Sequence, residues 1–228
     1  MVDDNSMIAQ RSFAKRYGLQ AMAPYNSLCA NITLDELSDQ VQLNWALVIL
    51  AVSGDYLSER SLLDYALDVL DEDSDEVVNQ LALLHFESRP SLVLRDSLIS
   101  ALIESISLIE WEYGFEQLFY VAVNWLYHRW EEFDDPALSL YEIDDDFYCL
   151  ECGDVFNYHN FWPEGAKTRQ DLSECMHKRC MHFLETEKER LRDLCLDDSD
   201  DLKSLDDIYN CWEQFNSYDL PNFIQDEH

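Results

Sequence analysis

The chain has 228 residues, of which 47 are acidic and 15 are basic, so its formal net charge is −32 and its isoelectric point is near 4.1. An apolar fraction of 47% supplies a sizeable core and argues against wholesale disorder, while five Gly and five Pro are too few for a β-sandwich, a barrel or a Gly-rich phosphate loop. The strong negative charge excludes binding to a phosphate backbone, which leaves a soluble, acidic, mostly helical protein.

Amphipathic segments follow one another along the first part of the chain. Residues 33–36 (Thr-Leu-Asp-Glu) fit a capping box, and apolar residues at helical spacing continue to Ala51. Gly54 is expected to end this helix. Ser58 is expected to cap a second helix, whose apolar stripe runs to Leu70.

Three more helices are predicted before the composition changes. Asp73 or Ser74 can begin the third, and Pro90 ends it. The fourth is predicted over residues 94–109 and the fifth over residues 115–130. Short connections between these helices favour antiparallel neighbours, and we therefore predict an antiparallel helical bundle or array.

Residues 137–163 are rich in aromatic residues and show only short-range sequence patterns, which predicts a small β-rich or irregular insert. Residues 168–194 are predicted to be helical again, and residues 205–215 to form a last short helix. We therefore expect a helical domain over residues 1–136, followed by an insert and C-terminal helices over residues 137–228.

A pair of cysteines in the predicted insert suggests a metal site. Cys149 and Cys152 lie three residues apart, as in a zinc knuckle, and a second pair follows at Cys175 and Cys180. Residues five apart on a regular helix point about 140° apart, so Cys175 and Cys180 can share an ion only if one lies at a helix end. His177 with Cys180 is the alternative second pair.

Four such ligands would form a closed tetrahedral zinc site, which would hold the insert onto the next helix and leave no position for a catalytic water. Three readings remain beside it, one of which is disulfide bonding among the cysteines. The cysteines on the predicted helix can be small buried apolar residues without metal. A zinc hydrolase would instead require an open coordination position.

No other set of residues in the sequence indicates catalysis. The sequence contains no Gly-x-Ser-x-Gly, phosphate-loop, His-Glu-x-x-His or dinucleotide motif, and we predict that the chain is not an enzyme. His85 and His128 fall in helical segments and are expected to be structural. Glu110, Glu112 and Glu116 are expected to lie on a solvated helix face, with a pocket lining as the alternative.

The charge is concentrated in the middle of the chain, because residues 17–166 contain 29 acidic and only four basic residues. Self-repulsion of this size destabilises a compact state, which suggests a use for the surplus charge, namely attraction of a basic protein surface. Any single run can also be a solvated turn. The predicted contact residues are Asp71, Glu72, Asp73, Glu131, Glu132, Asp134, Asp135, Asp144, Asp145 and Asp146.

Two groups of segments carry a family resemblance. They are Leu43-Asn44-Trp45-Ala46, Gly54, Leu57 and Leu62 to Leu70, then Trp125-Leu126-Tyr127, Glu131 to Pro136 and Tyr141 to Phe147. Through these segments, residues 40–147 resemble a bacterial family found in polymorphic-toxin immunity loci, whereas residues from 148 onward depart from its pattern. The resemblance implies a helical immunity protein that neutralises a toxin by binding it, with no catalytic residues.

The leading hypothesis from sequence is a cytoplasmic inhibitor whose acidic surface occludes a basic toxin, with a nuclease as the expected target. The alternative is a DNA mimic from a phage or mobile element, and a third reading is a helical scaffold whose charge only maintains solubility. We expect no membrane contact, because the longest apolar stretch is far shorter than the roughly 20 residues that span a bilayer, and the acidic start of the chain lacks a secretory signal.

Overall fold

The computed structural model describes residues 12–20, 22–71, 74–87, 91–147 and 168–193, and this part of the chain is helical without a strand. The prediction of a mostly α protein is therefore confirmed. The chain divides into two compact units, Met1–Val121 and Ala122–His228. The boundary falls inside one continuous helix, α8 (Leu108–Tyr127).

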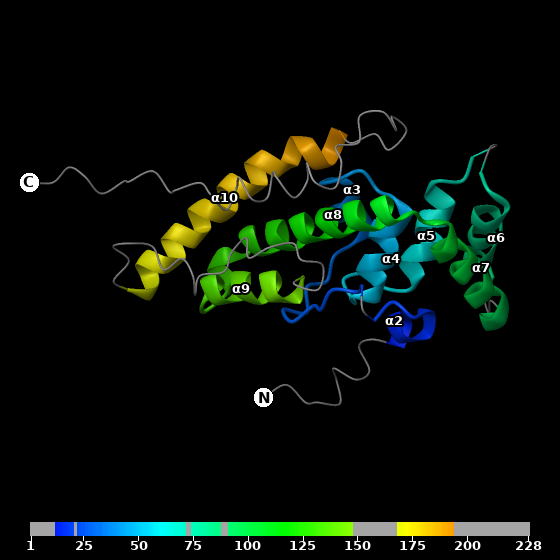
Figure 1. Ribbon diagram of the computed structural model, residues 1–228, viewed down its shortest axis with the longest axis horizontal. Helices are drawn as coiled ribbons and strands as arrows, with labels where there is room; N and C mark the ends of the chain where they lie inside the picture. The colour runs from blue at the N-terminus through cyan, green and yellow to red at the C-terminus, as the bar shows by residue number, and fades with distance from the viewer. Residues whose placement is uncertain (1–11, 21, 72–73, 88–90, 148–167, 194–228) are drawn as a thin grey trace, which may run out of the picture. The chain divides into compact units, whose positions relative to one another are not determined.

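Short helices that pack on their neighbours in sequence make up most of the first unit. α4 packs on α5, α5 on α6 and α6 on α7, while α2 packs on α4 (Figure 1). The helices are α2 (Ser12–Tyr17), α3 (Leu34–Ser38), α4 (Trp45–Ser53), α5 (Arg60–Asp68), α6 (Glu76–His85) and α7 (Leu92–Ser105).

The long helix predicted from Thr33 to Gly54 is two helices in the structure. The predicted capping box is present, since the Glu36 N–H donates to Thr33 Oγ1 at 3.2 Å and the Thr33 N–H donates to Glu36 Oε2 at 2.8 Å. α3 nevertheless ends at Ser38, and α4 begins with its own cap, where Asn44 Oδ1 accepts the Leu47 N–H at 2.9 Å. An asparagine that caps a new helix takes an extended conformation, which interrupts the helical spacing that the prediction followed.

The core of the first unit is built around α4. Every residue of this helix from Ala46 to Ser53 is buried, so the helix has no solvent face. A helix that is apolar on all sides belongs inside a protein, and neighbouring elements must cover it on every side. Gly54 ends α4, as the sequence predicted.

α8 approaches the beginning of α4 unusually closely. A Cβ atom on Gly114 would lie 2.6 Å from the Leu47 backbone nitrogen, so only glycine fits at this crossing. One turn further on, Gln117 is fully buried and makes two hydrogen bonds. Its side-chain oxygen accepts from Asn44 Nδ2 at 2.6 Å, and its Nε2 donates to the Gln42 carbonyl oxygen at 2.8 Å. The α4 cap is thereby tied to α8.

The fourth predicted helix is also divided, because the chain turns at Ile106 and Ser107 between α7 and α8. Ser107 forms a second capping box: its N–H donates to Glu110 Oε2 at 2.7 Å, and the Glu110 N–H donates to Ser107 Oγ at 3.3 Å. The Ser-x-x-Glu pattern of a capping box is present in the sequence. It lies within a stretch whose apolar residues keep helical spacing on both sides, so the spacing predicted one continuous helix.

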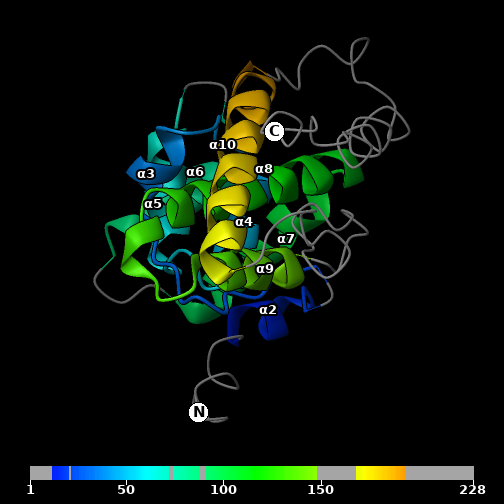
Figure 2. The same cartoon turned by 90° about the vertical axis from the view of Figure 1, so that its left-hand side faces the viewer.

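The second unit contains the end of α8, a 3₁₀ turn η1 (Trp130–Glu132), α9 (Pro136–Asp146) and α10 (Arg169–Asp193), and α9 packs on α10 (Figures 1 and 2). The predicted β-rich or irregular insert is wrong for residues 137–146, which belong to α9. Asp135 caps this helix and Pro136 occupies its first turn, a helix start that the aromatic composition obscured. The rest of the predicted insert and the predicted helix 205–215 lie outside the described residues, whereas the helix predicted over 168–194 is confirmed as α10.

Replacing Gly114 with alanine tests the close crossing of α8 and α4. Intrinsic helix propensity alone would stabilise the variant by about 1 kcal/mol. The new methyl group would instead meet backbone atoms of Ala46 and Leu47, which cannot move aside cheaply. We expect Gly114→Ala to lower the free energy of unfolding by about 1–3 kcal/mol, measured by urea denaturation. A gain in stability would contradict the described packing.

Candidate functional site

Four of the predicted contact residues lie together in the turn between α8 and α9. Glu131, Glu132 and Asp134 are exposed. Asp135 is half-buried and has structural contacts, since its Oδ1 accepts the Leu138 N–H at 3.2 Å and its Oδ2 lies 3.7 Å from Arg169 Nη1. The turn therefore presents three solvated carboxylates beside one that stabilises the start of α9.

The second predicted acidic run, Asp144 to Asp146, is part of α9, and the helix separates its members. Asp145 is exposed, but Asp144 and Asp146 are only 8% and 5% exposed. A buried carboxylate cannot meet a partner unless the helix rearranges. Of this run, only Asp145 is available on the described surface.

The third run, Asp71 to Asp73, precedes α6 in the first unit. Asp71 is exposed and forms a local turn, in which the Ser74 hydroxyl donates to Asp71 Oδ1 at 2.7 Å and the Asp71 N–H donates to Ser74 Oγ at 2.8 Å. Glu72 and Asp73 lie outside the described residues. α6 is capped by Asp75, one or two residues later than predicted, whose carboxylate accepts the Val77 N–H at 3.1 Å.

The predicted metal ligands are divided between described and undescribed parts of the chain. Cys149 and Cys152 lie outside the described residues. Cys175 and Cys180 both lie inside α10, so neither is at a helix end, which was the condition for their sharing an ion. Within the described ranges, no group of three or more His, Cys, Asp or Glu side chains is placed to hold a metal. The zinc site remains a prediction that depends on Cys149 and Cys152.

The surroundings of Cys180 favour a neutral thiol. The residue has no exposed surface, and burial raises the pKa of its thiol to about 12. Because metals bind the thiolate, an ion at Cys180 would have to displace this proton. Cys175, by contrast, is half-exposed.

His177, the alternative metal ligand, packs against aromatic rings within the second unit. Its ring stacks on Tyr127 with centroids 4.8 Å apart and planes 15° apart, and it meets Trp130 edge-on at 5.0 Å. Nearby, the Arg129 guanidinium lies 4.7 Å from the centroid of the Trp125 ring. The two His177 contacts hold α10 against the end of α8 and η1, a packing role that the sequence did not reveal.

The three glutamates of α8 do not share the solvated face that the sequence predicted. Glu110 caps the helix through Ser107, whereas Glu116 is buried. Oε2 of Glu112 is buried without a hydrogen-bond partner, and burial raises the pKa of this carboxyl group. The prediction of a solvated face is therefore wrong for Glu116, which lies among the buried aromatic residues of α8.

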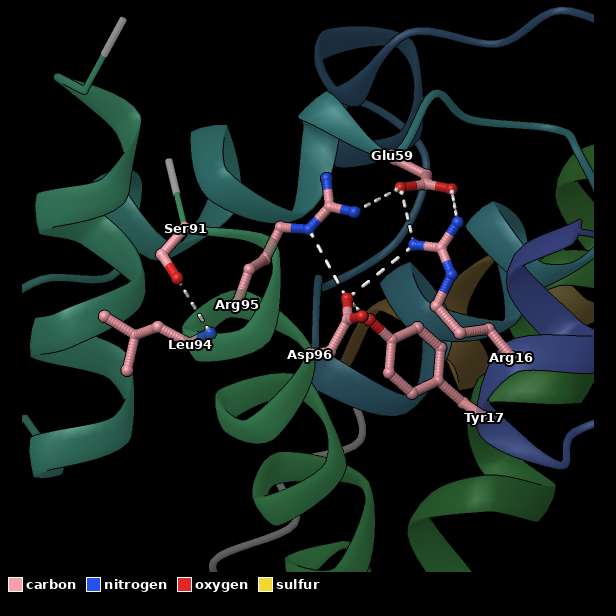
Figure 3. Close-up of polar contacts among 7 residues, drawn as sticks. All are labelled: Arg16, Tyr17, Glu59, Ser91, Leu94, Arg95 and Asp96. Carbon is pink, nitrogen blue, oxygen red and sulfur yellow. Dashed lines mark hydrogen bonds and ion pairs between the residues drawn. The ribbon is translucent and has the colours of Figure 1, made fainter. Parts of the chain in front are cut away.

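Sequence reasoning also missed a charge network that joins α2, α7 and the residue preceding α5 (Figure 3). Glu59 accepts from two arginines: its Oε2 lies 3.4 Å from Arg16 Nη1 and 3.2 Å from Arg95 Nη2. Asp96 Oδ1 lies 3.7 Å from Arg16 Nη1 and accepts the Tyr17 hydroxyl at 2.6 Å. The partners are 36–80 residues apart in sequence, so no local pattern could have indicated the network.

This network pairs two arginines with two carboxylates inside the first unit. Burial disfavours the Arg16 cation, but its hydrogen bond with Tyr17 and the charges of Glu59 and Asp96 outweigh that effect and raise the pKa of Arg16. Burial, reinforced by the hydrogen bond to Asp96, raises the pKa of Tyr17 to about 12. The ion pairs and the hydrogen bond of this cluster hold α2 and α7 against the start of α5.

These features define an acidic helical protein with exposed carboxylates and internally paired arginines. Residues 34–188 match the model of a family described as uncharacterised proteins conserved in bacteria (DUF2247). The match spans more than half of the chain, and the chain therefore belongs to this family. The predicted resemblance to a bacterial family is confirmed at this level, whereas its connection with toxin loci stays a prediction.

No curated protein and no solved structure gives a significant match to the chain. Among the described residues, none of the helices combines the length and the apolar character that crossing a bilayer requires.

The Tyr17–Asp96 contact predicts a loss of stability at alkaline pH. A tyrosine whose pKa is raised from 10.0 to about 12 on folding stabilises the fold fully below pH 10, and this contribution is lost as the pH rises from 10 through about 12. The free energy of unfolding, measured by urea denaturation across this range, should therefore fall less steeply in Tyr17→Phe than in the wild type. Tyr25→Phe, at an exposed tyrosine, is the matched control. Parallel slopes for Tyr17→Phe and the wild type would contradict the assignment.

Proposed function

We propose that the chain is a non-enzymatic inhibitor of the immunity type, which binds a basic toxin, with a nuclease as the expected target, and occludes it through acidic surface residues. The observation that carries this proposal is the exposure of carboxylates from the predicted runs, in particular Glu131, Glu132 and Asp134 in one turn. Asp145, in the same unit, is exposed as well, whereas the buried Asp144 and Asp146 are left out of the proposed surface. Asp71 is exposed on the first unit.

The arrangement of the basic residues supports the same proposal. Residues 17–166 contain only four arginines, and Arg89 among them lies outside the described residues. Arg95 is paired with Glu59, and Arg60 Nε lies 3.1 Å from Asp64 Oδ1. Arg129 lies over the Trp125 ring. Because these three arginines are engaged by other groups of the protein, they do not offset the surplus of acidic residues in this part of the chain.

An acidic surface of this kind would act first on the rate of association. A concentrated potential draws an oppositely charged protein toward the correct face and can raise the association rate constant by about 10- to 1000-fold. The carboxylates would then accept hydrogen bonds from lysine and arginine residues that normally bind the substrate phosphates of a nuclease. Occlusion would follow from occupancy of that basic site and requires no chemistry by the inhibitor.

The test is the association of the purified protein with a catalytically inactive form of a candidate toxin, chosen as a basic nuclease whose gene neighbours that of this protein, followed by stopped-flow fluorescence. Raising the ionic strength to about 0.5 M should slow association by tenfold or more while changing dissociation much less, because screening acts mainly on the encounter. The double variant Glu131→Gln/Glu132→Gln should slow association at low salt.

The matched control is Glu174→Gln/Glu185→Gln, which makes the same change in net charge at exposed residues of α10. If the two double variants behave alike, net charge rather than this turn attracts the partner. Salt-independent association would contradict the electrostatic mechanism. Competition by duplex DNA, together with binding to unrelated DNA-binding proteins, would favour the DNA-mimic alternative.

A further inference from the structure

An arginine, an aspartate and a histidine meet where α5 packs on α6. Arg60 and Asp64 lie one turn apart on α5, and Arg60 Nε donates to Asp64 Oδ1 at 3.1 Å. His85 is the last residue of α6, and Arg60 Nη2 donates to its carbonyl oxygen at 3.1 Å. Arg60 therefore connects the beginning of α5 with the end of α6.

The ring of His85 contacts both charged side chains through one nitrogen atom. Nδ1 lies 2.9 Å from Arg60 Nη2 and 2.9 Å from Asp64 Oδ1. A guanidinium group can only donate hydrogen bonds, whereas an ionised carboxylate can only accept them. Nδ1 accepts when it carries no proton and donates when it carries one. It can therefore satisfy Arg60 or Asp64 at a given moment, but not both.

The charge of the ring decides which of the two is satisfied. In a neutral imidazole whose proton is on Nε2, the lone pair of Nδ1 accepts from Arg60, and Asp64 keeps its hydrogen bond from Arg60 Nε. In an imidazolium ion, Nδ1 donates to Asp64, and the two groups form an ion pair. Arg60 then loses an acceptor and has a second cation beside its Nη2, which repels it.

The position of His85 allows both states to form. Asp64 favours the imidazolium ion, and so does the last turn of α6, where the helix dipole attracts a cation. Arg60 opposes the imidazolium ion by repulsion. The His85 side chain is 25% exposed, so a proton can reach it from solvent, and the half-exposed Arg60 side chain has room to move.

Other charged groups near the end of α6 act on the ring only from a distance. α7 also packs on α6, and its described charged residues are Arg95, Asp96 and Glu104. The first two belong to the network shown in Figure 3, and the third is the last residue but one of α7. Glu76 is at the other end of α6, and Glu87 is exposed just after it. Among the described residues, Arg60 and Asp64 are the charged groups that contact the ring.

We propose that Arg60, Asp64 and His85 form a proton-sensitive latch between α5 and α6. At about pH 8 the neutral ring accepts from Arg60, and at about pH 5 the ring carries a proton on Nδ1 and is paired with Asp64, since histidine is the side chain whose charge ordinarily changes in this range. The guanidinium group of Arg60 then moves away from the ring into solvent. This device goes beyond the proposed function and does not rest on it.

Long-range hydrogen–nitrogen NMR correlation spectra of the isotope-labelled full chain test the latch, because they report which ring nitrogen carries a proton. His85 should carry its proton on Nε2 at about pH 8 and a proton on both nitrogens at about pH 5. The side-chain signals of Arg60 should shift over the same pH range as the ring. This shift should be lost in His85→Gln and kept in His182→Gln, the matched control at an exposed histidine of α10.

A second pair of variants tests the role of the carboxylate. Asp64→Asn removes the group that stabilises the imidazolium ion, so the titration of the His85 ring should move to lower pH by at least about half a pH unit. Asp68→Asn makes the same change in net charge one turn further along α5, at an exposed residue, and should move the titration less than half as far. Circular dichroism should show the same helix content for all four variants, because none of the substituted side chains is fully buried.

Three results would overturn the inference. A proton on Nδ1 at about pH 8 would mean that the ring is bound to Asp64 throughout the range, without an exchange of partner. Arg60 signals that stay constant while the ring titrates would show that the guanidinium group does not respond. Equal effects of Asp64→Asn and Asp68→Asn would assign the titration of the ring to the general negative field of the chain.

Discussion

Repulsion among surplus carboxylates is the constraint that the rest of this structure has to satisfy. A chain with a formal charge of −32 must gain enough from apolar burial to outweigh its own field. The first unit does so with α4, a helix buried on every side, against which α8 packs so closely that Gly114 is required. The buried Asn44–Gln117 hydrogen bond fixes the register of that contact, since an unpaired amide there would be costly.

The charged residues then fall into two groups with different roles. Asp75, Asp135 and Glu110 cap helices, where the helix dipole favours negative charge, and Glu59 and Asp96 hold arginines within the first unit. Others, such as Glu131, Glu132 and Asp134, are simply exposed. The first group explains the fold, and the second group is what the proposed inhibitor would use.

Local signals predicted much of the helical content but not its divisions or its long-range contacts. The capping box at Thr33, the end of α4 at Gly54 and the course of α10 follow from patterns within a few residues. Helical spacing concealed the breaks at Asn44 and Ser107, because apolar residues on both sides kept the same period. The Arg16–Glu59–Arg95 network and the stacking of His177 on Tyr127 join distant parts of the chain, which no local pattern encodes. No local pattern indicates that Asp144 is buried either, because its burial depends on how α9 packs.

The most direct measurement is the stability of the isolated protein as a function of salt. If the surplus carboxylates repel one another in the folded protein, added salt should screen that repulsion. The Debye length falls from about 30 Å at 0.01 M to a few ångströms at 0.5 M ionic strength. The free energy of unfolding at neutral pH should therefore rise across this range of sodium chloride. A free energy that stays constant or falls would show that the carboxylates are already balanced within the fold, in which case no surplus charge would be available to attract a partner.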